Sequence, residues 1–265
     1  MHGYDSYETI AAAREGRILR LTINRPDVLN AVNARMHYEL SRIFYDVTAD
    51  EETDIVILTG AGRAFCAGGD LDWLQAAADD PELFARIAVE AKQIIFGMLD
   101  CEKPIVCRLN GDAIGLGATM VLFSDVIVAA ETARIGDLHV NVGLVAGDGG
   151  AIIWPQLIGY PRAKEFLMTG KIIDGKAAAE MGLVNYAVLP EELDVKTDEL
   201  ARRLDRGPTM AVRLTKAAIN VGLKQLAHGM MDASIAYESL TNTMPDHQEG
   251  LAAFREKRKP NFGGG

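Results

Sequence analysis

The stretch "ARIGDLHVNVGLVAGDGGA", residues 133–151, holds side chains that could transfer protons. It contains one histidine, His139, flanked by two acids, Asp137 and Asp148. A histidine oriented by a carboxylate acts as a general base near neutral pH. The glycines that separate His139 from Asp148 allow a turn that would bring the two side chains together. The stretch therefore predicts a His139–Asp148 acid–base pair.

Each of these side chains also has a structural interpretation. Asp148 precedes a helical run, where aspartate is a preferred N-cap. Asp137 faces the same side as His139 if the strand is regular, or else it marks a solvated strand end. A single histidine in a strand and turn is often a packed residue of the core. The residues alone leave these alternatives open.

Two glycine-rich turns could present backbone N–H groups to a ligand. The first is "AFCAGGDL", residues 64–71, and the second is "NGDAIGLGATM", residues 110–120. Small residues let the backbone approach a ligand closely, and free N–H groups at such turns bind oxyanions. The helix predicted after the second turn adds the positive end of its dipole. Neither turn has the glycine spacing of a dinucleotide site or a P-loop.

Hydrophobic periodicity indicates the elements that must position these residues. The run 82–99 has helical spacing, and Asn30 is expected to cap an earlier helix. Four apolar runs are typical of strands, at residues 18–26, 54–60, 103–111 and 126–136. A strand, a glycine turn and a helix recur in this order, which indicates an α/β fold. From about Pro208 the chain has a helical pattern and no strand signal.

The composition excludes some partners. With 27 Lys and Arg against 37 Asp and Glu, the net charge of −10 argues against a nucleic-acid surface and against docking on an anionic membrane. No apolar run reaches the roughly 20 residues of a membrane span. The 3 cysteines and 5 histidines show no metal-ligand spacing, so we expect no metal. Because the cysteines form no disulfide pattern and no secretory signal is found, we expect a cytoplasmic location.

Six motifs follow one another along the chain. They are "NRPDVLNA", "GAGRAFCAGGDL", "KPIVCRLNGDAIGLG", "SDVIVAAETARIG", "NVGLVAGDGGA" and "FREKRKPNF". Together they make nearly the whole chain resemble the crotonase superfamily, also called the enoyl-CoA hydratase/isomerase family. The resemblance implies an α/β fold, a crotonase-like superhelix of ββα units with a C-terminal helical oligomerisation region. It places the spiral core in residues 1–205 and the helical region in residues 206–265, and it implies a homotrimer or a dimer of trimers.

Members of this family bind acyl-CoA thioesters and hold the thioester oxygen with two backbone N–H groups. The resemblance assigns these oxyanion-hole donors to Ala67 and Leu116. Members usually have glycine where this chain has Leu116, so the leucine side chain would narrow or redirect the pocket. Coenzyme A enters as part of the substrate, and no tightly bound cofactor is expected.

The resemblance also implies residues that hold the CoA moiety. Ala64, Asp70 and Leu71 fall where members bind the adenine, and Arg25 falls near the pyrophosphate. Lys257, in the basic run "REKRKP", would meet the nucleotide phosphates of its own or a neighbouring subunit. Otherwise this run is a solvated helix face.

The chain departs from the family's hydratase pattern at both acid–base positions. Hydration in the best-known members resembles a two-glutamate device, and this chain has Thr119 and His139 at those positions. Glu238 either reaches a neighbouring pocket or lies at the surface. Trp73 either belongs to the acyl pocket or a lid over it, or packs as an ordinary helical residue.

Three functions therefore remain open. The first is an acyl-CoA enzyme of the enoyl-CoA hydratase/isomerase type with unusual acid–base residues. The second is a hydrolase of C–C bonds in 1,3-dicarbonyl compounds or acyl-CoA, in which a His139–Asp148 dyad activates water. The third is a CoA-binding or RNA-binding scaffold without turnover, against which the net charge of −10 argues.

Overall fold

The computed structural model describes residues 3–263. The strands are β1 (Ile10–Glu15), β2 (Ile18–Ile23), β3 (Ile55–Gly60), β4 (Ala64–Cys66), β5 (Ile105–Leu109), β6 (Asp112–Ile114), β7 (Val126–Ala130), β8 (Arg134–Gly136), β9 (Ile173–Asp174) and β10 (Tyr186–Val188). The α-helices are α1 (Ala34–Ala49), α2 (Leu71–Asp79), α3 (Pro81–Asp100), α4 (Leu116–Leu122), α5 (Gly150–Ile158), α6 (Tyr160–Thr169), α7 (Gly175–Glu180), α8 (Leu193–Asp205), α9 (Thr209–Asn242) and α10 (Pro245–Glu256). Short 3₁₀ helices are η1 (Tyr4–Ser6), η2 (Pro26–Val28), η3 (His139–Val142) and η4 (Pro190–Glu192).

The strands form two sheets that share a repeating ββα unit. One sheet has the order β1-β2-β3-β5-β7-β10 and the other has the order β4-β6-β8-β9. Each of the pairs β3 and β4, β5 and β6, and β7 and β8 sends one strand to each sheet, and helices follow each pair. All pairings are parallel except β1 with β2 and β8 with β9. The predicted α/β superhelix is confirmed.

The strand-like run at residues 126–136 contains two strands, β7 and β8. The chain turns after β7, where the Ala133 N–H donates to the Ala130 carbonyl at 2.9 Å, and β8 then joins the other sheet. Helical residues 82–99 are confirmed within α3. A run of apolar residues cannot show that its two halves pair with different sheets, because pairing depends on distant strands.

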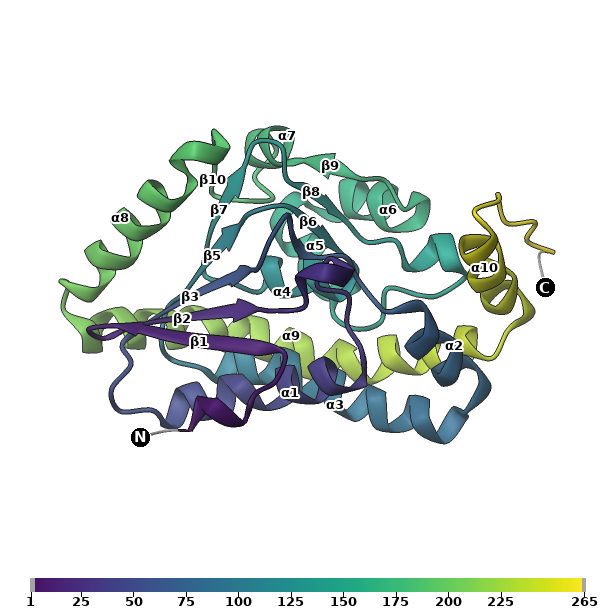
Figure 1. The fold of residues 1–265 in the computed structure, drawn as a ribbon, viewed down its shortest axis with the longest axis horizontal. Helices are drawn as coiled ribbons and strands as arrows, with labels where there is room; N and C mark the ends of the chain where they lie inside the picture. The colour runs from purple at the N-terminus through teal and green to yellow at the C-terminus, as the bar shows by residue number, and fades with distance from the viewer. Residues whose placement is uncertain (1–2, 264–265) are drawn as a thin grey trace.

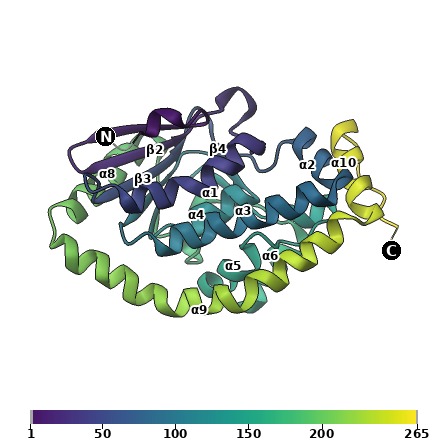
Figure 2. The same cartoon turned by 90° about the horizontal axis from the view of Figure 1, so that it is seen from below.

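Helices cover both faces of the larger sheet (Figures 1 and 2). Alternate residues of β2 point to opposite sides, so Leu19 and Leu21 pack in the main core with α1 and α3, whereas Ile18 faces α8. The long helix α9 runs beneath the molecule from the end of α8 to α10 (Figure 2). Side chains of α9 bond to the core: for example, Lys216 Nζ donates to the Lys103 carbonyl and Asn220 Nδ2 to the Leu99 carbonyl. Within residues 3–263, no helix is both long and apolar enough to cross a membrane.

Asn30 does not cap a helix, contrary to expectation. Asn33 caps α1 instead, since its side-chain oxygen accepts the Met36 N–H at 3.0 Å. Asn30 is buried with a left-handed backbone, and its Nδ2 donates to the Ala61 and Ala64 carbonyls. Asn30 therefore ties the loop before α1 to the strand that leads into the first glycine-rich turn.

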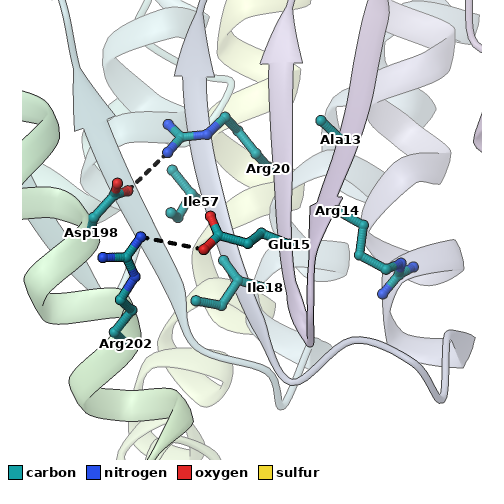
Figure 3. A pocket seen from close by; sticks show the side chains of 8 residues that line it. All are labelled: Ala13, Arg14, Glu15, Ile18, Arg20, Ile57, Asp198 and Arg202. Carbon is teal, nitrogen blue, oxygen red and sulfur yellow. Dashed lines mark hydrogen bonds and ion pairs between the residues drawn. The ribbon is translucent and has the colours of Figure 1, made fainter.

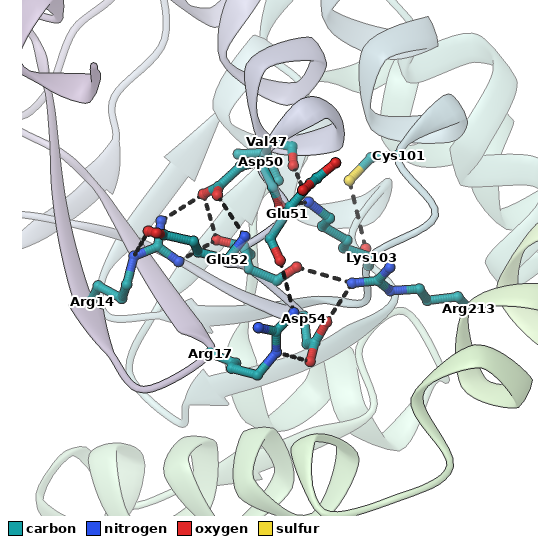
Figure 4. Close-up of polar contacts among 11 residues, drawn as sticks. Arg14, Arg17, Val47, Asp50, Glu51, Glu52, Asp54, Cys101, Lys103 and Arg213 are labelled. Atoms are coloured by element: carbon teal, nitrogen blue, oxygen red, sulfur yellow. Dashed lines mark hydrogen bonds and ion pairs between the residues drawn. The ribbon is translucent and has the colours of Figure 1, made fainter. Parts of the chain in front are cut away.

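A cluster of charges holds the C-terminal end of α1 (Figure 4). Lys103 is buried, and its Nζ donates to the carbonyls of Val47 and Asp50. Each carbonyl also accepts one backbone N–H, Val47 from Asp50 and Asp50 from Thr53, so the ammonium adds a second donor at the end of the helix. Nearby, Asp54 accepts from both Arg17 and Arg213, so this cluster links α1, the start of β3 and α9.

A small hollow of about 160 Å³ lies between α8 and the strands β1 and β2 (Figure 3). Arg20 pairs with Asp198 at 2.9 Å, and Arg202 pairs with Glu15 at 3.3 Å, so two ion pairs bridge helix and sheet. The guanidinium of Arg14 is held by an aspartate at the end of α1. The charges that line this hollow are thus paired with one another or with neighbours, as is typical of a structural contact between a helix and a sheet.

Candidate active site

His139 is held by Asp137, two residues before it. Strand β8 ends at Gly136, and the chain turns into η3, which begins with His139. The Asp137 carboxylate accepts the Nδ1–H of His139 at 2.7 Å and its backbone N–H at 3.2 Å. Asp137 is only 1% exposed, so it is not a solvated strand end. Because a carboxylate only accepts, this bond leaves Nε2 as the free nitrogen of His139.

Asp148 reaches the other nitrogen of the same imidazole. The chain passes through η3 and returns, so that Asp148 Oδ2 lies 3.7 Å from His139 Nε2. Its second oxygen, Oδ1, accepts from the Thr119 hydroxyl of α4 at 3.4 Å. The N-cap position of α5 is Gly149, not Asp148. The structure therefore brings the predicted pair together and also places Thr119 beside it.

Electrostatic interactions among these groups favour a charged histidine. Burial lowers the pKa of His139, but the charges of Asp137 and Asp148 outweigh it and hold this pKa well above the usual value. Burial raises the pKa of Asp148, and the His139 charge opposes that rise. At neutral pH the imidazole is therefore a proton donor beside a buried carboxyl group.

Glu238 of α9 joins this group of acids from the C-terminal region. It lines the same cavity, and burial raises its pKa to about 8, against the lowering effect of His139. A Cβ on Gly147 would lie 2.6 Å from Glu238 Oε2, so the glycine permits the approach of α9. Glu238 is half-buried and lines the cavity, in line with the alternative that it reaches a pocket. Glu238 lies 90 residues from Asp148 in sequence, so no local pattern could show that the two line one cavity.

The two glycine-rich turns differ in which N–H groups they leave free. The Ala67 N–H donates to the Leu29 carbonyl at 3.1 Å and so offers no free donor. The Gly69 N–H, two residues later, meets no acceptor among residues 3–263 and lines the cavity. Leu116 is the first residue of α4, and its N–H also meets no acceptor in the described chain. A signal for Gly69 was present in the Gly68–Gly69 pair.

The His139 ring lies against the second of these turns. A Cβ on Gly115 would be 3.5 Å from His139 Cε1 and 3.9 Å from Nε2. Gly115 has φ 55, a left-handed conformation that favours glycine. The free N–H of Leu116 follows directly. The His139 imidazole and an unpaired backbone N–H are thus neighbours.

A cavity of about 360 Å³ connects these groups. His139, Asp148 and Glu238 line one part of it. The remaining lining is mostly apolar and comes from α2, α3 and the helices around them, including Leu71, Leu74, Ala77, Phe84, Ile87, Ala88, Ala91, Leu116, Leu144 and Ile235. Trp73 also lines the cavity, in line with the alternative that it belongs to a pocket. Small-molecule sites have this composition, an apolar hollow with a few polar groups.

The residues predicted to hold CoA are spread around the start of α2 and the C-terminus. Arg25 lies 3.8 Å from Asp70, and Asp70 caps α2 by accepting the Asp72 N–H. Leu71 lines the cavity, and Ala64 is buried in β4.

The basic C-terminal run is divided between paired and unpaired charges. Lys257 follows α10 and is exposed with a left-handed backbone. Its neighbour Arg258 instead pairs with Glu249 and Glu256.

One group of side chains has the geometry of a metal site. Ligand atoms of Asp137, His139 and Asp148 lie within 4.8 Å of one another. A hydrogen bond within this group engages Nδ1 of His139 and Oδ1 of Asp137.

Comparisons with known proteins point to one family. The family model of enoyl-CoA hydratase/isomerase proteins matches residues 13–265. A crotonyl-CoA hydratase of Syntrophomonas wolfei is 34% identical over 259 residues, 97% of this chain and 98% of that protein. The structure of an enoyl-CoA hydratase/isomerase from Mycobacterium paratuberculosis has a TM-score of 0.90 and 35% identity, covering 94% of this chain and 99% of that one. A β-diketone hydrolase of the cyanobacterium Anabaena has a TM-score of 0.84 and 30% identity, covering 91% and 96%.

Proposed function

The chain belongs to the enoyl-CoA hydratase/isomerase family and processes acyl-CoA thioesters, and from this premise we propose that it adds water to a 2-enoyl-CoA with His139 and Asp148 as the acid–base pair. The observation that carries the proposal is the 3.7 Å approach of Asp148 Oδ2 to His139 Nε2 at the wall of the cavity. Asp148 supplies the carboxylate that position 119 lacks, and Thr119 bonds to it.

This spacing suits a water molecule held by both groups. Two polar atoms 3.7 Å apart can each lie at about 2.8 Å from one water oxygen, a normal hydrogen-bond length. The His139 Nε2–H donates to the water and Asp148 accepts from it. An acid and a base thus share one nucleophile, as hydration requires.

The reaction follows from these positions. Asp148 takes a proton from the water as its oxygen bonds to the β-carbon, and the electron pair of the double bond moves to the thioester oxygen. The N–H groups of Gly69 and Leu116 stabilise the negative oxygen of this enolate; Gly69 takes the place of Ala67, whose N–H is engaged. The α-carbon then receives the proton of His139 Nε2, and the proton on Asp148 returns to His139. In total, the β-carbon gains a hydroxyl group, the α-carbon gains a hydrogen, and His139 and Asp148 return to their starting protonation states.

The test compares wild type with His139→Gln and Asp148→Asn on 2-enoyl-CoA thioesters of several chain lengths. Each variant keeps the size of its side chain and loses proton transfer, so we expect kcat to fall by about 10²–10⁴-fold. Mass spectrometry of the wild-type product should show the gain of one water. Calorimetry with the product thioester should show binding retained in both variants. Full turnover by His139→Gln would overturn the proposal, and a double bond that moves without a mass change would indicate an isomerase instead.

A C–C bond hydrolase is the second candidate. The similarity to a β-diketone hydrolase and the histidine held between two carboxylates favour it. Water activated at the same place would attack a carbonyl carbon, and the C–C bond would break with its electrons held as an enolate. The same assay with 3-ketoacyl-CoA and cyclic 1,3-diketones distinguishes the two, because cleavage yields two products or an opened ring.

The CoA moiety is proposed to bind at Arg25, Ala64, Asp70, Leu71 and Lys257, as the resemblance implies. Support comes from the position of Leu71 in the cavity and from the ion pair of Arg25 with Asp70 next to it. We propose that turnover needs no metal, since His139 and Asp148 can transfer the protons of the reaction themselves. Dialysis against a chelator should leave kcat unchanged.

Assembly and location are proposed as well. The helix α9 leaves large apolar side chains exposed at Met210, Leu214, Ile219, Tyr237 and Leu240, and exposed apolar surface is typical of subunit contacts. We propose a homotrimer or a dimer of trimers in the cytoplasm. A solution mass of three or six chains by light scattering is expected, and a mass of one chain would contradict it.

A further inference from the structure

A second histidine lines the cavity, on α1. His37 is 2% exposed, and its Nδ1–H donates to the Glu90 carboxylate of α3 at 2.6 Å. Its ring packs on the Trp73 indole of α2, with ring centres 5.1 Å apart. Three helices therefore fix one imidazole in one orientation.

The bond to Glu90 determines what His37 offers the cavity. A carboxylate accepts and does not donate, so Nδ1 carries the hydrogen, and in that tautomer Nε2 has a lone pair. No side chain or backbone group within residues 3–263 bonds to this Nε2. The ring faces a ligand space with a hydrogen-bond acceptor that the protein leaves unpaired.

The apolar surroundings of His37 offer its Nε2 no other polar partner among the described residues. The other side chains that α2 and α3 contribute to the lining are apolar apart from the Trp73 indole, among them Leu74, Phe84 and Ala88. A polar atom that loses water without gaining a partner is destabilised. A purely hydrocarbon acyl chain that filled this part of the cavity would cause that loss, whereas a hydroxyl group would donate to Nε2 and avoid it.

We propose that His37, oriented by Glu90 and Trp73, is a specificity-determining residue that accepts a hydrogen bond from a hydroxyl group on the acyl part of the substrate. The substrate class is then a hydroxylated 2-enoyl-CoA, with the hydroxyl beyond the two reacting carbons. The inference rests on the proposed function for the identity of the thioester. It concerns a different side chain from the acid–base pair and can be tested by binding alone.

The experiment uses matched thioesters that differ by one hydroxyl. One pair is cinnamoyl-CoA and its 4-hydroxy derivative, and a second series is straight-chain 2-enoyl-CoA of six to ten carbons with and without a terminal hydroxyl. Binding is measured by calorimetry in the His139→Gln background, where turnover is blocked. In at least one of these series, we expect the hydroxylated thioester to bind about 10-fold more tightly than the matched compound without the hydroxyl. In His37→Phe on the same background this preference should disappear.

The control is His228→Phe, which makes the same change on an exposed part of α9 and should keep the preference. Equal binding of every pair to the His37-containing protein, or a preference that survives His37→Phe, would overturn the inference. If the pairs bind as expected and wild type adds no water to either member, the proposed hydration fails while the specificity assignment stands. If water is added to both members equally well and binding is equal, hydration stands and the assignment fails.

Discussion

At the scale of single residues, Asp137 determines which nitrogen of His139 is left free. Its Oδ1 accepts the Nδ1–H at 2.7 Å, which directs Nε2 toward Asp148. Its Oδ2 is buried without a partner among the described residues and lies close against Gly150, at the N-terminal end of α5. The positive end of that helix stabilises the negative charge. Asp137 is thus a positioning residue for His139.

Asp137→Asn should lower kcat by about 10²-fold or more, because the amide no longer fixes the tautomer of His139. The Asp137 charge also raises the pKa of His139, so the variant should lose the acid form at lower pH. The basic limb of the kcat profile is expected to move to lower pH. Asp27→Asn, the same change in an exposed turn, is the control. An unchanged pH profile in Asp137→Asn would contradict the positioning role.

Glu238 should make the stability of the protein depend on pH. Its pKa is raised from 4.5 to about 8 in the folded state, with Asp137, His139 and Asp148 as its charged neighbours. Between these values the folded chain keeps the proton and the unfolded chain releases it, so stability falls as pH rises through this window. Melting curves from pH 5 to 9 should show this fall. In Glu238→Gln the fall in Tm over this range should be smaller by a few degrees. If Tm falls with pH equally in both proteins, Glu238 is not the group responsible.

At the scale of elements, α10 supports the short helix η3 that carries His139. The His247 Nδ1–H donates to the Val142 carbonyl at 2.6 Å. A Cβ on Gly250 of α10 would lie 2.7 Å from the Val142 backbone, so the two segments meet without side chains between them. On its other side, α10 is held against α2 by the ion pair of Arg255 with Asp72 and by a hydrogen bond between the side-chain amides of Gln75 and Gln248. The C-terminal helix is therefore part of the site's support.

Gly250→Ala should push α10 away from η3, because backbone atoms cannot yield as a flexible side chain does. We expect Tm to fall by several degrees and kcat to fall about 10-fold. Gly222→Ala is the matched control, since nothing lies within 4 Å of a Cβ at that position of α9. Alanine there should stabilise the helix by about 0.5–1 kcal/mol and leave kcat unchanged. Equal effects of both variants would contradict this account.

At the scale of the whole molecule, the polar clusters divide between stability and chemistry. The group around Lys103 joins α1, the start of β3 and α9, and none of its members lines the large cavity (Figure 4). The group around His139 comes from the turns after β8 and before α5, from η3, and from α4 and α9. Its members His139, Asp148 and Glu238 line that cavity. The helix α9 takes part in both, since Lys216 and Glu238 lie near its two ends.

Lys103→Met should destabilise the protein by about 2–4 kcal/mol, since the two carbonyls at the end of α1 lose a buried donor. Urea unfolding measures the change. Turnover at temperatures where the variant is folded should equal that of wild type, because Lys103 does not line the cavity. Lys164→Met, on the exposed surface of α6, should change stability by less than about 0.5 kcal/mol.

The sequence by itself determined the local features. Periodicity is a property of neighbouring residues, so it predicted α3 and the strand runs, and it identified the all-helical C-terminal region from about Pro208. The ordered motifs predicted the family and the ββα superhelix. The composition of one stretch singled out His139 and Asp148, which the structure brings to 3.7 Å.

Only the tertiary structure decided the features that depend on distant segments. Whether an N–H is free depends on the acceptor across the turn: the Ala67 N–H meets the Leu29 carbonyl, whereas the Gly69 N–H meets no acceptor among the described residues. The burial of Glu238 depends on where α9 crosses the core, and the bond of His37 to Glu90 joins two helices 53 residues apart. Local propensity contains no term for such contacts, because burial and hydrogen bonding are set by what packs against a residue in space.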